Sequence, residues 1–382
     1  MNGRLARWRD GVLRLLTLVA KPVRRAQGRG GVVVEPYRGY GSDREAFLIG
    51  RVFRQTHAEE AADLHDLWAH LRDIARRIRR RALAGVPVTA TLGTATSEAE
   101  TDRDGYYRVH LNLFGKPAGG KDGWHAAKLT VAVGPIIEAE TSVFIPPPGS
   151  RFVVVSDIDD TVMHTGVANK LAMLWRLFVA RAESRVAFSG VAAFYRALHH
   201  GVNGGEANPI LYVSRAPWGT YDMLTTFFRA HDIPVGPELF LREWGLSWRH
   251  PWPRRASDHK CELIDNMLAL YPDMPFVLIG DSGQHDPEVY ADIVQRHAGR
   301  VTAIYIRDVT PNPQRRAKVE RLARNVAGSG STMVLAADCT VMAEHAAVSG
   351  LIGPEWVSKV AADGEVPTAS GTTFDLGRQR RS

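Results

Sequence analysis

Four short runs of aliphatic residues, separated by helical stretches, are the feature that most constrains the fold of this chain. The runs are FVVVS at 152–156, ILYVS at 210–214, FVLIGD at 276–281 and VTAIYIR at 301–307. Strands that are apolar along their whole length are buried on both faces, and their alternation with helices is typical of a parallel sheet covered by helices. A further strand and helix within residues 333–347 continue the pattern. The sequence therefore predicts an α/β domain over residues 150–350.

Residues 31–149 show a different pattern, in which apolar and polar residues alternate over short segments. These segments lie at 31–40, 46–53, 86–92, 104–113, 126–133 and 141–146. A period of two over short segments predicts antiparallel strands, and we expect a small β-sandwich that precedes the α/β domain. A helical insertion at 59–83 interrupts it, and the arginines in its second half are either solvated or bind phosphate. The PPPG segment at 146–149 places the domain boundary near Gly149.

The two ends of the chain differ from the domains between them. Residues 1–30 carry eight basic side chains and one acid, with apolar residues gathered on one helical face. This predicts a basic amphipathic helix that lies on an anionic lipid surface or docks against protein. Residues 363–382 are polar and are expected to form a disordered tail.

Composition limits the partners and the location of the protein. A net charge of +7 favours an anionic partner, such as a lipid surface, a nucleic acid or a phosphorylated substrate. Cys261 and Cys339 lack the spacing of a disulfide framework or a zinc site, which fits a reducing compartment. No apolar run approaches the roughly 20 residues of a membrane-spanning helix. We expect a cytoplasmic protein with peripheral contact with the inner face of the membrane.

Polar residues follow the aliphatic runs at the point where each predicted strand ends. They are Asp157, Asp159, Asp160 and Thr161 after the first run, Ser214 and Arg215 after the second, and Asp281 and Asp286 after the third. Lys260 lies between the second and third runs. The carboxyl ends of parallel strands meet at one edge of a sheet, so these side chains are expected to converge there. Clustered carboxylates without histidine or cysteine suit Mg²⁺, and Mg²⁺ with a lysine forms a receptor for a phosphoryl group.

These motifs resemble those of the haloacid dehalogenase superfamily of phosphotransferases. DIDDT at 157–161 matches its D-x-D-x-T pattern, and Ser214, Lys260 and GDSGQHD at 280–286 stand in the places of the second, third and fourth motifs. A closer resemblance, over roughly residues 150–310, is to the catalytic domain of the actin-patch-associated phosphatidate phosphatase and its bacterial relatives. The resemblance implies a Rossmann-like haloacid dehalogenase domain.

The resemblance also implies a division of roles between two aspartates. Asp157 would be the nucleophile that forms an aspartyl-phosphate, and Asp159 the acid that protonates the leaving alkoxide and then activates water. Mg²⁺ would be held by the Asp157 carboxylate, the main-chain carbonyl of Asp159 and Asp281, with Asp286 in support. The phosphate would be held by Ser214, Lys260 and Arg215, although Arg215 could instead pair with a nearby acid. Thr161 would orient the loop.

The substrate implied in this way is phosphatidate, or a related lipid phosphate, hydrolysed to diacylglycerol and phosphate. Two alternatives stay open. One is a phosphatase of a soluble or nucleic-acid-end phosphate ester, with nucleic acid the less favoured partner. The other is a membrane or protein adaptor in which catalysis is secondary. In the haloacid dehalogenase superfamily, an insert in the place of the helical segment at 163–209 can cover the active site. The tryptophans and arginines of 242–255 suit a lipid entrance, helix packing or a nucleic-acid surface.

Overall fold

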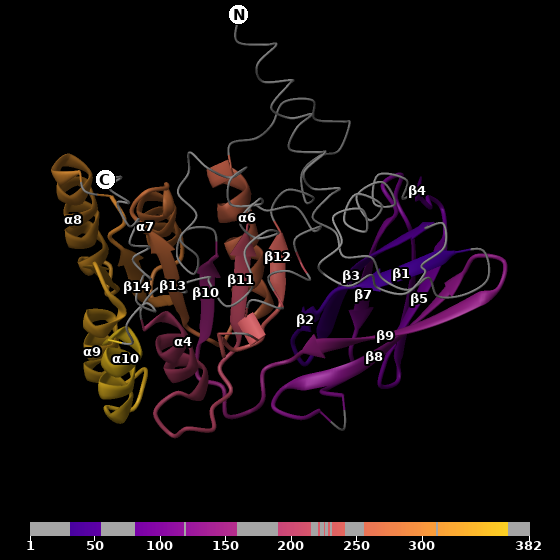
Figure 1. Ribbon diagram of the computed structural model, residues 1–382, viewed down its shortest axis with the longest axis horizontal. Coiled ribbons are helices and arrows are strands. Elements are labelled where there is room, and N and C mark those ends of the chain that lie inside the picture. Colours follow the sequence, from indigo (N-terminus) through magenta and orange to yellow (C-terminus); the bar gives the residue numbers. More distant parts are fainter. Residues whose placement is uncertain are drawn as a thin grey trace, which may run out of the picture.

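The computed structural model describes residues 31–54, 81–117, 120–158, 190–214, 228–229, 231–240, 256–310 and 312–365, together with Tyr221 and Thr225. Two sheets dominate this part of the chain (Figure 1). The predicted N-terminal helix, most of the insertion at 59–83, residues 163–189 of the insert, the 242–255 segment and residues 366–382 lie outside the described residues. Within the described residues, no helix has the length and hydropathy needed to cross a membrane.

The sheet built by residues 153–336 contains six described strands, all paired in parallel, and we call it the second or parallel sheet. Its spatial order is β12 (Glu238–Phe240), β11 (Ile210–Ser214), β10 (Val153–Asp157), β13 (Phe276–Asp281), β14 (Val301–Arg307) and β15 (Thr332–Ala336). The four aliphatic runs form β10, β11, β13 and β14, which confirms the predicted parallel sheet. β12 was not predicted, because three residues are too few to show a strand pattern.

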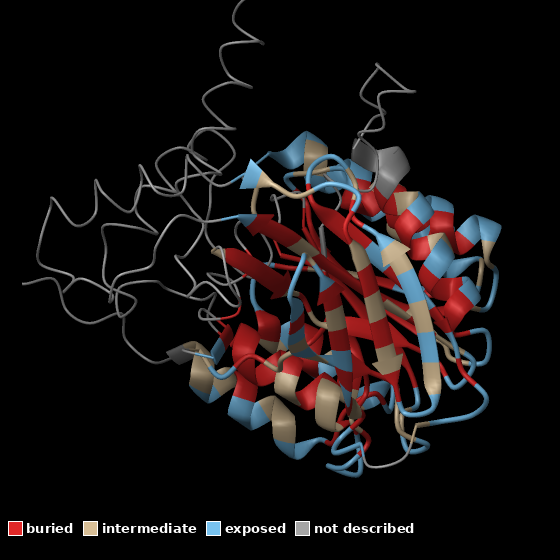
Figure 2. Cartoon of the chain, turned by 90° about the vertical axis from the view of Figure 1, so that its right-hand side faces the viewer, coloured by how far each residue is buried: buried red, intermediate tan, exposed pale blue. Residues whose placement is uncertain are grey.

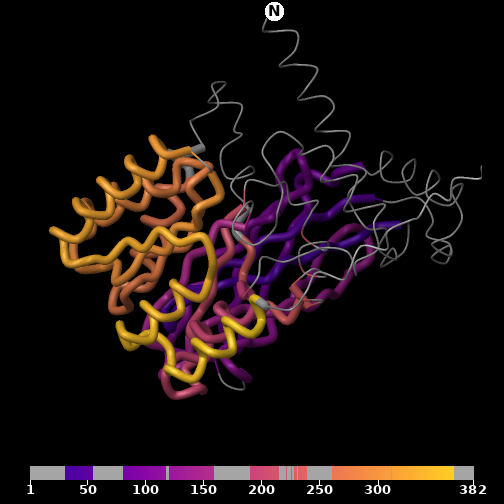
Figure 3. The backbone as a smooth tube through the Cα atoms, turned by 60° about the vertical axis from the view of Figure 1, so that its left-hand side comes forward, coloured from indigo at the N-terminus to yellow at the C-terminus, as the bar shows by residue number. Residues whose placement is uncertain are grey.

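Helices cover both faces of this sheet. They are α4 (Val191–His200), α6 (Ala256–Leu270), α7 (Asp286–Arg296), α8 (Pro313–Ala327), α9 (Cys339–Val348) and α10 (Glu355–Glu365). α4, α9 and α10 share one apolar core with alternate residues of β10, and α6, α7 and α8 share a second core with the intervening ones. Figure 3 shows α7 and α8 in orange and α9 and α10 in yellow as separate groups. The prediction of a sheet buried on both faces is confirmed.

The first sheet contains nine strands and is mostly antiparallel. They are β1 (Val32–Pro36), β2 (Gly39–Gly41), β3 (Glu45–Arg54), β4 (Arg81–Ala82), β5 (Pro87–Leu92), β6 (Ala95–Glu100), β7 (Tyr106–Asn112), β8 (Trp124–Ala132) and β9 (Ile136–Phe144). The order is β1-β3-β2-β9-β8-β5-β6, with β4 and β7 paired to β3, and only β2 and β9 pair in parallel among these strands. Hydrogen bonds thus join all nine strands, and the predicted two-sheet sandwich is not confirmed.

Alternation of side chains decides which face of each strand is buried. Every second residue of β8 is buried, and Figure 2 shows the same alternation of buried and less buried positions along strands of this sheet. Apolar residues from β1, β3, β5, β7, β8 and β9 form a third core. β6, with the sequence ATSEAE, was missed because its residues are small or polar and none of its positions is fully buried.

Three predicted boundaries can be compared with the described helices and strands. The expected helix at 59–83 cannot reach its predicted end, because Arg81 and Ala82 form β4 and pair with the end of β3. β9 ends at Phe144 and β10 begins at Val153, so Gly149 lies in the connection between the sheets. α10, which was not predicted, continues to Glu365, past residue 363 where the tail was expected to begin.

Residues of the first sheet and its connections share apolar clusters with the parallel-sheet domain. Tyr37, Ile49 and Tyr106 of the first sheet belong to the same apolar cluster as residues of β10, β11 and α4. Tyr40 contributes to the cluster on the other face. The first sheet is therefore joined to the parallel sheet by buried apolar contacts.

Candidate metal and phosphate site

Three buried carboxylates meet at the carboxyl edge of the parallel sheet. Asp157 ends β10, Asp281 ends the neighbouring β13, and Asp286 begins α7. One carboxylate oxygen from each lies within 4.8 Å of the others. Their exposed fractions are 1%, 0% and 2%, so water screens their mutual repulsion weakly. The structure thus brings together three of the residues predicted to converge.

The position of the cluster follows from the order of the strands. From β10 the chain builds β11 and β12 on one side, then crosses to build β13, β14 and β15 on the other. The strand order therefore reverses between β10 and β13. In an open parallel sheet, ligands bind outside the carboxyl ends of the strands at such a switch point. Asp157 and Asp281 flank it.

Lys260 of α6 is the cation at the centre of the cluster. Its Nζ donates hydrogen bonds to Asp157 Oδ2 at 2.9 Å and to Asp286 Oδ1 at 2.5 Å, and the lysine is 6% exposed. Burial acts to lower the pKa of Lys260, but the charges of Asp157 and Asp286 outweigh it and raise that pKa well above its usual value. Lys260 is therefore a buried ammonium ion that joins two of the three acids.

The three buried carboxylates also act on one another and on the cations near them, Lys260 and Arg307. Burial raises the pKa of Asp286 to about 7; Lys260 opposes this shift, while Asp157 and Asp281 add to it. Three buried carboxylates whose oxygens lie within 4.8 Å of one another form an oxygen-only donor set, which suits a hard divalent cation such as Mg²⁺. Asp157, Asp281 and Asp286 are the residues of the described chain that fit such an ion.

The loop between β13 and α7 orients Asp281. The backbone N–H groups of Gly283 and Gln284 donate to Asp281 Oδ1 at 2.7 and 2.9 Å, and the Gln284 side-chain amide donates to Oδ2 at 3.1 Å. Asp286 Oδ2 accepts from the backbone N–H of Asp281 at 3.2 Å. A Cβ on Gly280 would lie 2.3 Å from Asp286 Oδ2, so a glycine is needed there. The GDSGQHD segment thus folds so that its two acids face the same point.

Arg315, in the first turn of α8, donates hydrogen bonds to this loop, and the sequence analysis did not predict it. It donates to the carbonyl of Ser282 at 2.7 Å, to the carbonyl of Gln284, and to both carboxylate oxygens of Glu288. Lys318 also pairs with Glu288, at 2.7 Å. Burial would raise the pKa of Glu288, but the hydrogen bonds from Arg315 and Lys318 lower it to about 2. We call this Arg315–Glu288 pair, with its two loop carbonyls, the Arg315 brace.

Two buried tyrosines contact the strands that carry Asp157 and Asp281, and the sequence analysis did not predict them either. The hydroxyls of Tyr195 and Ser156 are 2.5 Å apart, directly before Asp157 in β10. Tyr290 donates to the carbonyl of Ile279, and its ring centroid lies 5.6 Å from Lys260 Nζ. Tyrosines are common in apolar cores and their sequence positions carry no site signal, so only the fold could reveal these contacts.

Ser214, the predicted phosphate contact, ends β11 at the same edge of the sheet and is 1% exposed. Asp157 is in register with Val213, which places Ser214 one residue beyond the end of β10. The other predicted site residues, Asp159, Asp160, Thr161 and Arg215, lie outside the described residues. Their roles stay predictions.

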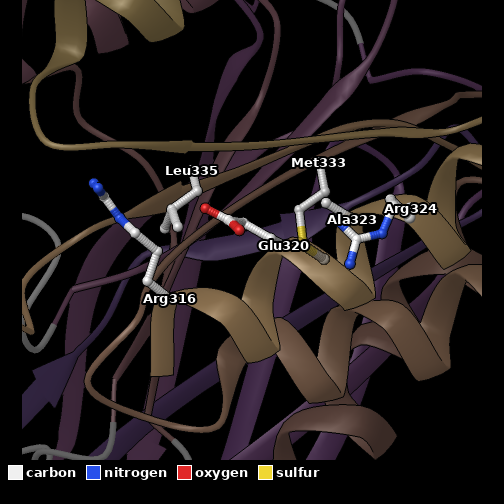
Figure 4. Close-up of a pocket in the computed structure, with 6 residues that line it drawn as sticks. All are labelled: Arg316, Glu320, Ala323, Arg324, Met333 and Leu335. Carbon is white, nitrogen blue, oxygen red and sulfur yellow. The ribbon is translucent and has the colours of Figure 1, made fainter. Parts of the chain in front are cut away.

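A shallow hollow between α8 and β15 does not belong to this cluster. Figure 4 shows its lining, in which two arginines and a glutamate of α8 face two apolar residues of β15. The lining residues are Arg316, Glu320, Ala323, Arg324, Met333 and Leu335. β15 is separated from β13 by β14, so the hollow is remote from the acids along the sheet.

Comparison with known proteins supports the resemblance seen in the motifs. Residues 152–308 match the family model described as the catalytic domain of phosphatidate phosphatase APP1. Phosphatidate phosphatase APP1 of Saccharomyces cerevisiae is 32% identical over 174 residues, which cover 45% of this chain and 28% of that protein. An uncharacterized protein of Schizosaccharomyces pombe is 27% identical over 156 residues, covering 41% of this chain and 25% of that protein. The chain thus matches only about a quarter of the length of these relatives.

Solved structures resemble the chain only remotely. A carbohydrate acetylesterase from Xanthomonas citri aligns over 76% of this chain and 72% of its own, with 9% identity and a TM-score of 0.26. A likeness at that level carries no argument. The predicted resemblance of residues 150–310 to the APP1 catalytic domain is confirmed by the sequence matches, and the haloacid dehalogenase motifs are consistent with them.

Proposed function

We propose that this protein is a Mg²⁺-dependent phosphatase that hydrolyses phosphatidate, or a related lipid phosphate, through an aspartyl-phosphate in a haloacid dehalogenase-like domain. The observation that carries the proposal is the convergence of Asp157, Asp281, Asp286 and Lys260 at one buried edge. The same residues lie within the segment that matches the catalytic domain of a phosphatidate phosphatase. The switch point between β10 and β13 supports a phosphate-binding site at this edge.

In the first step, an Asp157 carboxylate oxygen would form a bond to phosphorus while the bond from phosphorus to the lipid alkoxide breaks. Lys260, 2.9 Å from Asp157 Oδ2, favours the ionised form of this carboxylate, which the attack requires. The proton that the alkoxide takes up would come from Asp159. Ser214 and Lys260 would donate hydrogen bonds to the oxygens of the transferring group, whose negative charge needs such partners.

In the second step, water would attack phosphorus and Asp159 would take the proton of that water, which releases phosphate and regenerates Asp157. Mg²⁺, held by Asp157, Asp281 and Asp286, would supply positive charge to the phosphoryl oxygens. The Asp281 loop keeps its carboxylate oriented through three hydrogen bonds. Each described residue of the cluster thus has a role in holding charge at the reacting group.

The direct test is the Asp157→Asn variant, assayed for phosphate release from phosphatidate in mixed micelles with Mg²⁺ and with EDTA. We expect the unaltered protein to release phosphate only with Mg²⁺. The activity of the variant should be at least about 10³-fold lower, because an amide is not a nucleophile. Asp265→Asn is the matched control. Asp265 pairs with Arg296 and His297 on the surface of α6 and α7.

Soluble phosphate esters and short oligonucleotides with terminal phosphates form the comparison substrates. Selective turnover of the lipid supports the proposal. Full activity in Asp157→Asn would disprove the mechanism. Faster turnover of the oligonucleotide than of the lipid would show that the substrate is a nucleic-acid end. Contact with an anionic membrane stays a prediction that the same assay in phosphatidate vesicles addresses.

A further inference from the structure

Arg38 of the first sheet reaches into the parallel-sheet domain. It lies in the two-residue connection between β1 and β2, and its guanidinium donates to Glu238 Oε1 at 3.0 Å and to Thr225 Oγ1 at 3.2 Å. Its backbone N–H donates to the hydroxyl of Tyr221 at 3.0 Å, and the guanidinium carbon lies 5.8 Å from that ring centroid. The side chains of Arg38 and Glu238 are 14% and 0% exposed. We call this set of contacts the Arg38 latch.

Hydrogen bonds within the first sheet fix the backbone next to Arg38. The backbone N–H of Tyr37 donates to the carbonyl of Ile49 at 3.0 Å, and Thr141 Oγ1 donates to the carbonyl of Tyr37 at 2.7 Å. The ring of Tyr37 packs on Tyr221 with centroids 4.7 Å apart. Arg38 is therefore presented from a fixed backbone rather than from a free loop.

The residues that Arg38 contacts belong to the connection that follows Ser214. Tyr221 and Thr225 come after Ser214 in the chain, and Glu238 begins β12, in register with Tyr212. The hydroxyl of Tyr212 donates to the carbonyl of Pro234 at 2.7 Å, and its ring lies 4.5 Å from that of Phe228. This connection is thus tied to β11 on one side and to Arg38 on the other.

β12 ends the sheet and has only three residues. It pairs with β11, and within the described residues no further strand lies beyond it. A short edge strand with one neighbour is weakly held by its own hydrogen bonds. The contacts from Arg38, Tyr37 and their partners supply the support that another strand would give.

We propose that Arg38 is a positioning residue, which acts through Glu238 and the pairing of β12 with β11 to hold Ser214 in the geometry that binds phosphate. This inference rests on the proposed function. It makes the first sheet a working part of the phosphatase rather than a separate binding module. The phosphate side of the site then depends on a residue outside the catalytic segment matched at 152–308.

Burial of Glu238 is consistent with a function beyond stability. Its second oxygen, Oε2, is buried and has no hydrogen-bond partner in the described structure. Burial raises the pKa of Glu238 to about 7, although Arg38 and Thr225 oppose the shift. A buried ion pair contributes little net stability compared with apolar residues, but it requires one arrangement of its partners. Arg38 and Glu238 together specify where β12 lies beside β11.

The test compares Arg38→Ala with Arg51→Ala, both in the first sheet. Arg51 is the matched control because its guanidinium contacts Phe53 and Tyr106 of the first sheet and the carbonyl of Asp104 in the turn before β7. Since Arg38→Ala leaves Glu238 buried without its cation, a double variant, Arg38→Met with Glu238→Gln, removes both charges and protects the fold. Each protein is assayed for KM, kcat, inhibition by inorganic phosphate and activation by Mg²⁺.

We expect both Arg38 variants to raise KM and the inhibition constant of phosphate by about 10-fold, the lower end of what supporting residues of a site usually cause. kcat and the Mg²⁺ concentration for half activation should change much less, because the acid cluster is held by other contacts. The proposal is overturned if the Arg38 variants and Arg51→Ala have the same KM and the same affinity for phosphate.

A second measurement separates this proposal from the proposed function. Hydrogen exchange of β11 and of residues 231–240 needs no activity, and it should become faster in Arg38→Ala but not in Arg51→Ala. Exchange in β13 should stay unchanged in both. Absence of phosphatase activity in the unaltered protein would refute the function, whereas unchanged exchange in β11 would refute the latch.

Discussion

Two arginine–glutamate pairs support opposite sides of the candidate site, and the pKa values of their glutamates are shifted in opposite directions. In the Arg315 brace the pKa of Glu288 is lowered to about 2. In the Arg38 latch the pKa of Glu238 is raised to about 7. The residue types are the same, so the difference comes from the surroundings.

Exposure and the number of partners explain the contrast. The Glu288 side chain is 25% exposed and pairs with two cations, Arg315 and Lys318. The Glu238 side chain is 0% exposed, and among the described residues it pairs with one cation and its Oε2 has no hydrogen bond. Water at the surface of the brace reduces the cost of keeping the carboxylate ionised, and full burial in the latch raises that cost. Ion-pair geometry alone therefore does not predict how a pair affects stability.

The largest effect expected from this contrast is on the free energy of unfolding after removal of each arginine. At pH 8, Arg38→Ala should lower it by about 3–5 kcal/mol, because the buried Glu238 loses its cation and must either stay charged without a partner or take up a proton. Arg315→Ala should lower it by about 1–2 kcal/mol, because water reaches Glu288 and Lys318 still pairs with it. Urea denaturation of both variants measures the difference, and equal losses would contradict the comparison.

The second prediction concerns the pH dependence of stability that Glu238 causes. Because the folded-state pKa of about 7 lies above the ordinary value of 4.5, folding favours the protonated form. Its contribution is complete below about pH 4.5 and is lost as the pH rises through 7, on the order of 3 kcal/mol in total. Glu238→Gln should remove this part of the pH dependence, which urea denaturation at several pH values would show. A Glu238→Gln profile parallel to that of the unaltered protein would count against it.

The smallest effect belongs to Glu288 and has the opposite sign. Its pKa in the folded protein, about 2, lies below the ordinary value of 4.5, so its contribution is present above pH 4.5 and lost as the pH falls towards 2. Partial exposure limits this contribution to about 1 kcal/mol. Stability of Glu288→Gln and of the unaltered protein should therefore converge in acid and differ at pH 7. A difference in stability between the two proteins that stays constant across this pH range would contradict a lowered pKa of Glu288.

Much of the parallel sheet was predictable because its strands are apolar throughout. Runs such as FVVVS and FVLIGD have few alternatives once helices separate them, and β10 and β13 lie where they were predicted. β6 and β12 were missed because a polar edge strand and a three-residue strand carry no such pattern. The predicted helix at 59–83 was too long at its end, where hydrogen bonds to β3 outweighed local helix preference.

The acids of the site were predictable for the same reason, since each follows an apolar run. Asp157, Asp281 and Asp286 meet as expected, and Lys260 contacts two of them. Arg315 and Arg38 were not predictable. Arg315 stands 31 residues from Gln284, and Arg38 stands 200 residues from Glu238, with no motif that relates them.

By itself, the sequence determined that apolar strands end in carboxylates and that these ends share one edge, because the apolar runs and the helices that separate them can be read along the chain. Only the tertiary structure decided which distant arginines support that edge, and whether burial or the hydrogen-bond partners dominate the pKa of each glutamate. Those outcomes depend on which surfaces exclude water once the two sheets pack together, and a linear pattern does not contain that information.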